Sequence, residues 1–216
     1  LGLTFNAGQG NTPRRQFEYL SDKTLELDQD GNFTLILSQE AIDIPGQWVQ
    51  IPDDASGILV RQYIAVREKE ELPTLNIEVL GSPIQYKPVT DQEIANAIIG
   101  TSYAFLSLTT LHHRVLPELM EKTNVFIEAT SDTLGGAITG NDNLYMIGSY
   151  QLEDDEVLIM RVQPPNTRYW NIALESRWHE TADYLHRSTS LTLDEVNYSE
   201  DGSVEFVVAH KDPGHP

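Results

Sequence analysis

Apolar and polar residues alternate along most of the chain, as expected for β-strands with one buried face. In the segment 32–38, Phe33, Leu35 and Leu37 fall on one side of a predicted strand, and Asp30-Gly31 supplies a turn before it. Comparable runs, separated by Gly, Pro, Asn and Asp, lie at 56–66, 74–81, 143–152, 156–163, 168–175, 188–196 and 203–210. The spacing predicts a mainly β protein, an antiparallel β-sandwich or jelly roll.

One segment, 91–122, has a helical pattern instead. Thr90 and Glu93 have the spacing of a capping box, and apolar residues then recur at about helical intervals. Pro117 should kink or end the helix, because a proline removes a backbone hydrogen bond. We expect a helix over about 91–112, followed by a second short helical turn, as one insertion in the β fold.

The two flanks of this segment resemble each other. Both 19–39 and 184–210 begin with Tyr-Leu and contain an Asp-Gly pair before an apolar run. A chance likeness between two hairpins is the alternative, since Asp-Gly turns are common. A true duplication predicts two similar β halves, 1–89 and 125–216, joined by a helical connector, 90–124, within one compact domain.

The second copy stops where the first one continues. Gln39 is followed by a Pro-Gly corner, a tryptophan and a strand, whereas His210 is followed by 211–216 and the end of the sequence. The chain also lacks an initiator Met and opens in an apolar run. We therefore expect the sequence to be a fragment at both ends.

The amino-acid composition argues against several classes of function. The 216 residues include 33 acidic and 14 basic side chains, for a formal charge of −19. Such a charge repels phosphate backbones, so no nucleic-acid partner is predicted. The absence of cysteine excludes disulfides and thiolate chemistry, and no apolar run is long enough to predict a membrane span. The sequence does not separate a cytoplasmic from an exported protein, and it predicts no cofactor.

An aromatic and cationic group near the C-terminus is the candidate ligand site. Aromatic side chains suit sugars or apolar ligands, and an arginine can bind a carboxylate. The alternative is that these aromatic residues belong to the core of the sandwich. The candidates are Arg168, Trp170, Trp178, Tyr184 and His186.

His210 is the candidate catalytic residue. It ends the predicted strand 203–210 in register with Val204, Phe206 and Val208, where a histidine can act as an acid or base. A structural histidine at the rim of the core is the alternative. His179 and His186, with their neighbouring carboxylates, match no defined metal-binding spacing, so no metal site is predicted.

Several motifs together resemble a known bacterial family. They are N-D-N-x-Y at 141–145, G-x-Y-x-L at 148–152, R-Y-W-N at 168–171, D-Y-x-x-R at 183–187, and D-G-S followed by A-H-K-D-P-G-H-P at 201–216. The pattern is similar to the family called domain of unknown function 1214, and 56–81 is similar to the upstream part of the same proteins. The resemblance implies a jelly-roll β-sandwich, often beside a related domain of unknown function, 1254. It implies no catalytic residues.

Two hypotheses of function remain. The first is a module that binds a small molecule, a glycan or a protein partner without established catalysis. The second is a hydrolase-like enzyme that uses His210 with nearby carboxylates, in a cleft between the sandwich and the helix. The sequence has no G-x-S-x-G elbow and no phosphate-binding loop, and its oligomeric state is left open.

Overall fold

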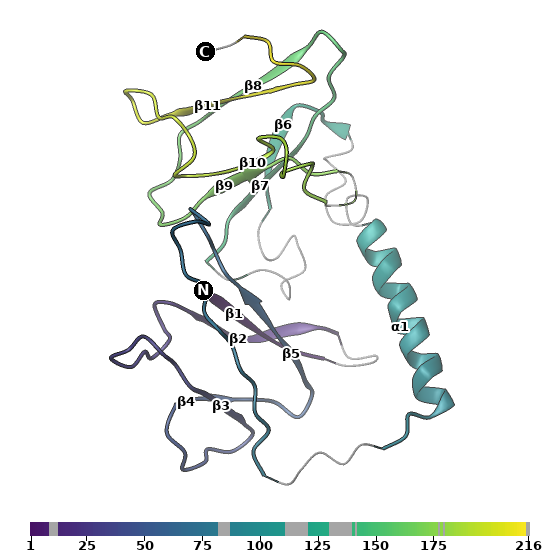
Figure 1. The fold of residues 1–216 in the computed structure, drawn as a ribbon. Helices are drawn as coiled ribbons and strands as arrows, with labels where there is room; N and C mark the ends of the chain where they lie inside the picture. The colour runs from purple at the N-terminus through teal and green to yellow at the C-terminus, as the bar shows by residue number, and fades with distance from the viewer. Residues whose placement is uncertain are drawn as a thin grey trace. The chain divides into compact units, whose positions relative to one another are not determined.

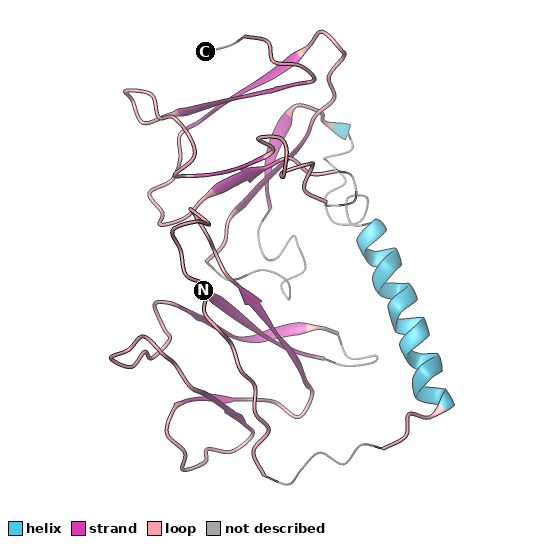
Figure 2. Cartoon of the chain, viewed as in Figure 1, coloured by secondary structure: helices cyan, strands magenta, loops and turns pink. Residues whose placement is uncertain are grey.

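The computed structural model describes residues 1–8, 13–81, 87–110, 121–129, 140, 142–176, 178 and 180–214. The chain forms two compact units, each assembled from two stretches of sequence. Unit 1 consists of 1–63 and 115–149, and unit 2 consists of 64–114 and 150–216. Strands supply most of the regular structure, and the long helix of the described part is α1, Asp91–Thr109 (Figures 1 and 2). The predicted mainly β fold with one helical insertion is confirmed.

Unit 1 contains three small sheets. Its strands are β1 (Gly2–Ala7), β2 (Arg15–Ser21), β3 (Leu35–Ser38), β4 (Gln47–Gln50), β5 (Ala55–Arg61), β6 (Val125–Ala129) and β7 (Tyr145–Ser149). The central strand β1 pairs antiparallel with β2 on one side and β5 on the other. β6 pairs antiparallel with β7, whereas β3 and β4 are parallel. The expected antiparallel pairing therefore dominates, with one parallel exception.

Strand β1 is buried along its whole length. Leu3 and Phe5 point to one face, where they form the main core of the unit with Leu20, Leu25 and Val49. The rings of Phe5 and Phe17 pack with their centroids 6.1 Å apart. Because side chains alternate along a strand, the opposite face of β1 carries Gly2, Thr4 and Asn6. That face is polar.

Unit 2 contains two antiparallel strand pairs. Its strands are β8 (Val157–Val162), β9 (Asn171–Ala173), β10 (Ser190–Thr192) and β11 (Val204–Ala209). β8 pairs with β11, and β9 pairs with β10. The core forms around Met160, Val204 and Phe206, with Trp170 and Ile172 packed against them.

The start of α1 follows the capping box. The backbone N–H of Thr90 donates to Glu93 Oε2 at 2.7 Å, and the Glu93 N–H donates to Thr90 Oγ1 at 3.3 Å. These bonds satisfy amide groups that have no partner inside the helix. The expected second helical turn lies outside the described residues. No described helix, α1 included, combines the length and the hydropathy that a membrane crossing requires.

The apolar side chains of α1 do not pack into a core. Ile98, Tyr103 and Phe105 are all more than half exposed. The strand predicted at 74–81 is wrong, because these residues form no strand and are exposed, with Ile77 at 94%. An alternating apolar pattern does not make a strand unless a second strand pairs with it, since the backbone hydrogen bonds come from the partner.

The two segments that resemble each other contain the same turn. In the first, the Asp28 N–H donates to Asn32 O and the Gly31 N–H donates to Asp28 O. In the second, the Ser199 N–H donates to Ser203 O and the Gly202 N–H donates to Ser199 O. Both glycines have positive φ, 82° at Gly31 and 78° at Gly202, a conformation that favours glycine. The strands that follow pair differently, so the duplication stays a prediction.

Candidate functional site

The polar face of the β2-β1-β5 sheet provides the base of the candidate site. Thr4 is fully buried at its centre and lies opposite Tyr19 on β2 and Leu59 on β5. Arg61, at the end of β5, donates a hydrogen bond from Nη1 to Thr4 Oγ1 at 3.3 Å. The sheet therefore holds an arginine and a tyrosine on either side of a buried threonine.

Two glycines leave room for the ring of Tyr19. A Cβ atom on Gly2 would lie 2.8 Å from Tyr19 Oη, and one on Gly140 would lie 2.8 Å from both Oη and Cζ. Real Cβ atoms do not approach other heavy atoms so closely. The phenol thus occupies the space that a side chain would need at either position, and this close packing fixes where the Tyr19 hydroxyl lies.

The Tyr19 hydroxyl donates a short hydrogen bond to Asp142 Oδ1, at 2.6 Å. Burial of the phenol, together with this bond and the nearby Tyr63, raises the pKa of Tyr19 well above its ordinary value. The hydroxyl therefore keeps its proton at neutral pH and acts as a fixed donor to the carboxylate. A hydrogen bond to a charged acceptor of this length is among the stronger ones in proteins.

Asn143 connects two further tyrosines. Its Nδ2 group donates to Tyr63 Oη at 2.8 Å and to Tyr145 Oη at 3.3 Å. The Tyr63 hydroxyl in turn donates to Asn143 Oδ1 at 3.1 Å. We call these five residues, Tyr19, Tyr63, Asp142, Asn143 and Tyr145, the tyrosine cluster.

The tyrosine cluster is accessible to solvent. Tyr19, Tyr63, Asn143 and Tyr145 are half-buried, and Asp142 is exposed. Three phenol hydroxyls, an amide and a carboxylate therefore meet at the surface of unit 1. These groups can donate and accept hydrogen bonds with a polar molecule.

The sequence contained a partial signal for this cluster. Asp142, Asn143 and Tyr145 belong to the N-D-N-x-Y motif. This motif supported the family resemblance, but it was not predicted to be a functional site. Tyr19 and Tyr63 precede Asp142 and Asn143 by 123 and 80 positions and belong to no shared motif. Their contribution depends on the fold.

Trp170, a predicted ligand contact, lies in the core of unit 2. Its ring packs edge-on against Tyr198, with centroids 6.5 Å apart, and against Phe206, with centroids 6.3 Å apart. Both ring planes are nearly perpendicular to that of Trp170, a favourable aromatic geometry. Trp170 therefore stabilises the packing around β11.

The other predicted ligand contacts lie at the surface of unit 2. Trp178 is 54% exposed, Tyr184 is 61% exposed, and Arg168 is also exposed. His186 Nδ1 lies 2.8 Å from Asp183 Oδ1, one helical turn earlier in sequence, and both side chains are largely exposed. The role of these residues in ligand binding stays a prediction.

The candidate catalytic residue His210 is exposed after β11. Its Nε2 lies 3.3 Å from the backbone carbonyl of Leu152. His179 lies outside the described residues. Across the described parts of the chain, no group of three or more His, Asp or Glu residues could hold a metal ion.

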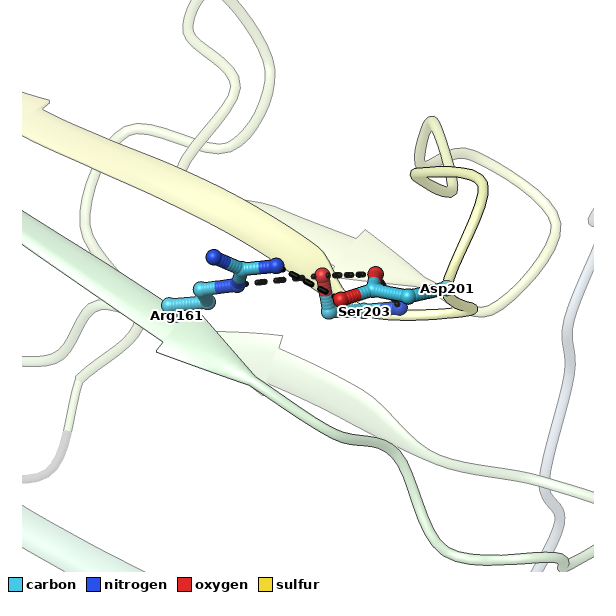
Figure 3. Close-up of polar contacts among 3 residues, drawn as sticks. All are labelled: Arg161, Asp201 and Ser203. Carbon is cyan, nitrogen blue, oxygen red and sulfur yellow. Dashed lines mark hydrogen bonds and ion pairs between the residues drawn. The ribbon is translucent and has the colours of Figure 1, made fainter.

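A second polar network fixes the D-G-S motif in unit 2 (Figure 3). Arg161 on β8 donates to Asp201 Oδ2 at 2.7 Å and to Ser203 Oγ at 3.2 Å. The Ser203 hydroxyl and backbone N–H both donate to Asp201 Oδ1, at 2.7 and 3.1 Å. The hydrogen bonds from Ser203, followed by the charge of Arg161, lower the pKa of Asp201. Because its polar groups bond to one another, this network stabilises the turn before β11.

Comparison with known proteins relates part of the chain to a family. The chain resembles an uncharacterised protein from Burkholderia cenocepacia of known crystal structure, with a TM-score of 0.80 and 24% sequence identity. The match covers 99% of this chain and 60% of the other, so the chain spans about three fifths of that protein and shares its fold. No curated protein matches the chain. The family model for a protein of unknown function, DUF1214, matches residues 124–216, which is less than half of the chain.

Proposed function

We propose that the chain is a ligand-binding β protein and that the tyrosine cluster of unit 1 is its binding site. The proposal rests on two hydrogen-bonded groups of side chains. Tyr19 is bonded to Asp142, and Asn143 is bonded to both Tyr63 and Tyr145. Their members come from β2, from the residues after β5 and from the segment that leads into β7. A site fixed by such separate segments is held in one geometry before any ligand arrives.

Preorganisation supports a role in binding. Groups that are already ordered lose little conformational freedom when a ligand binds, so more of the contact energy remains as affinity. The close packing of Tyr19 against Gly2 and Gly140 restricts its ring in this way. The partial exposure of the cluster leaves its polar groups within reach of a small polar molecule. A small molecule or glycan fits this site better than a large apolar partner does.

Ligand screening tests the proposal. Thermal unfolding is measured for the wild-type chain with a panel of sugars, carboxylates, amines and acyl compounds. Tyr63→Phe removes one hydroxyl of the cluster, and Tyr103→Phe removes an exposed hydroxyl of unit 2 as the matched control. We expect at least one compound to raise the melting temperature of the wild type and of Tyr103→Phe but not of Tyr63→Phe. A panel without any such compound contradicts the proposal and favours a protein-interaction role.

A hydrolase acting through His210 is the second candidate function. If the Nε2–H group donates to Leu152 O, the other ring nitrogen of the neutral histidine carries a lone pair and can accept a proton. The test is turnover of nitrophenyl esters and glycosides by the wild type and by His210→Ala. Activity that His210→Ala abolishes supports catalysis, whereas equal background rates in both proteins rule out this role for His210.

A further inference from the structure

Asp142 has one carboxylate oxygen left for a ligand. Oδ1 accepts the hydrogen bond from Tyr19, and within the described part of the chain Oδ2 accepts none. The side chain is exposed, so a ligand can reach Oδ2. A carboxylate oxygen accepts hydrogen bonds and donates none at neutral pH. This atom therefore requires a donor from the ligand.

Tyr145 has one proton left for a ligand. Its Oη accepts a hydrogen bond from Asn143 Nδ2, and among the described residues no acceptor takes the proton of its own hydroxyl. Both N–H groups of the Asn143 amide are already used, one on Tyr63 and one on Tyr145. The Tyr145 hydroxyl can therefore donate its proton to an acceptor on a ligand.

The unused groups are thus one acceptor, on Asp142, and one donor, on Tyr145. A hydroxyl group matches both, because it carries one proton and two lone pairs. Resting on the function proposed above, we propose that the tyrosine cluster binds a hydroxylated ligand of the sugar or polyol class that carries no anionic group. One ligand hydroxyl donates to Asp142 Oδ2, and a ligand oxygen accepts from the Tyr145 hydroxyl.

Charge selects against the other small-molecule classes. A ligand carboxylate or phosphate would approach the Asp142 carboxylate in a chain with a formal charge of −19, and like charges repel. A simple ammonium ligand without hydroxyl groups would pair with Asp142 but has no lone pair for the Tyr145 proton, since an ammonium only donates. Ligands with hydroxyl groups and no anionic group can use both Asp142 and Tyr145.

Three sugars that differ in charge test this inference on the whole chain. Binding of glucose, glucuronate and glucosamine, and of the corresponding galacto and manno series, is measured by isothermal titration calorimetry and by ligand-observed NMR. We expect a neutral sugar to bind more tightly than its uronate. Asp142→Asn and Tyr145→Phe should each weaken binding about tenfold or more, the loss of one hydrogen bond, whereas Tyr103→Phe, at an exposed position of α1, should leave it unchanged.

The outcomes separate this inference from the proposed function. If a uronate binds better than the neutral sugar and both cluster variants weaken it, the cluster is a binding site but the ligand class is wrong. If no sugar binds, or if neither cluster variant changes binding, the inference is overturned. Tyr145→Phe and Asp142→Asn are conservative, and circular dichroism of each variant shows whether the fold is retained.

Discussion

Tyr19 and Asp142 are separated by 123 positions in the sequence and joined by a hydrogen bond of 2.6 Å. The bond connects β2 to the segment that leads into β7, so it links two stretches of unit 1 that are far apart in the chain. One side chain is a phenol that keeps its proton, and the other is a carboxylate whose Oδ2 accepts no hydrogen bond from the described residues. The same contact therefore stabilises the unit and prepares the proposed site.

Tyr19→Phe should lower the free energy of unfolding by about 1 kcal/mol, because it removes a charge-assisted hydrogen bond that is partly screened by solvent. Urea unfolding measures the loss, with Tyr184→Phe as the control that removes an exposed phenol hydroxyl. A double-mutant cycle with Asp142→Ala should show that the two residues are coupled. Additive effects of the two changes would contradict a direct bond.

Stability should fall at alkaline pH in a way that depends on Tyr19. Burial and the bond to Asp142 raise the pKa of this phenol in the folded state above the ordinary tyrosine value near 10. The folded state holds the proton more tightly, so the stabilisation is complete below about pH 10 and is lost as the pH rises further. The free energy of unfolding, measured between about pH 8 and 12, should fall more steeply with pH for the wild type than for Tyr19→Phe. Equal slopes for the two proteins would contradict a raised pKa of Tyr19 in the folded state.

Acid should destabilise unit 2 through Asp201. Hydrogen bonds from Ser203 and the charge of Arg161 lower the pKa of this carboxylate below its usual value of 3.8 in the folded state. The stabilisation is therefore present above pH 3.8 and is lost as the pH falls below it, through the lowered pKa. Tryptophan fluorescence during acid unfolding should show this loss in the wild type but not in Asp201→Asn. Asp155→Asn, at an exposed turn before β8, is the control and should behave as the wild type does.

Trp170→Ala should destabilise the chain by about 2 to 3 kcal/mol, because it removes a half-buried ring that packs against Tyr198 and Phe206. Trp178→Ala should change stability by less than about 0.5 kcal/mol, since its ring is 54% exposed. Urea unfolding followed by circular dichroism compares the two variants. Equal losses of stability in the two variants would contradict the packing of Trp170 against Tyr198 and Phe206.

The sequence correctly predicted the structural features whose hydrogen bonds or backbone angles depend only on residues close together in the chain. The start of α1 was predicted correctly because Thr90 and Glu93 satisfy the first amide groups of the helix themselves. The turn at Asp201-Gly202 was also predicted, because a positive φ favours glycine. The strand predicted at 74–81 was wrong because a strand needs a partner, which a local pattern does not reveal.

The candidate site needed contacts between distant residues. The sequence singled out aromatic residues of unit 2, and Trp170 among them is partly buried against the core of that unit. The tyrosine cluster was missed as a site although three of its members lie within a noted motif. Tyr19 and Tyr63 join Asp142 and Asn143 only when β1, β2 and β5 form a sheet. The spacing of residues along the chain does not show which distant residues come into contact in the fold.

The tyrosine ring resonances of the folded chain test the central claim most directly. The nine tyrosines are labelled on the ring, and their NMR signals are followed as a neutral sugar is added. The proposed site predicts that the signals of Tyr145 and Tyr63 shift in a saturable manner while that of the exposed Tyr103 stays in place. The Tyr145→Phe variant assigns the Tyr145 signal. Signals of the cluster that do not move, or shifts confined to Tyr184 and Tyr198, would contradict binding at the tyrosine cluster.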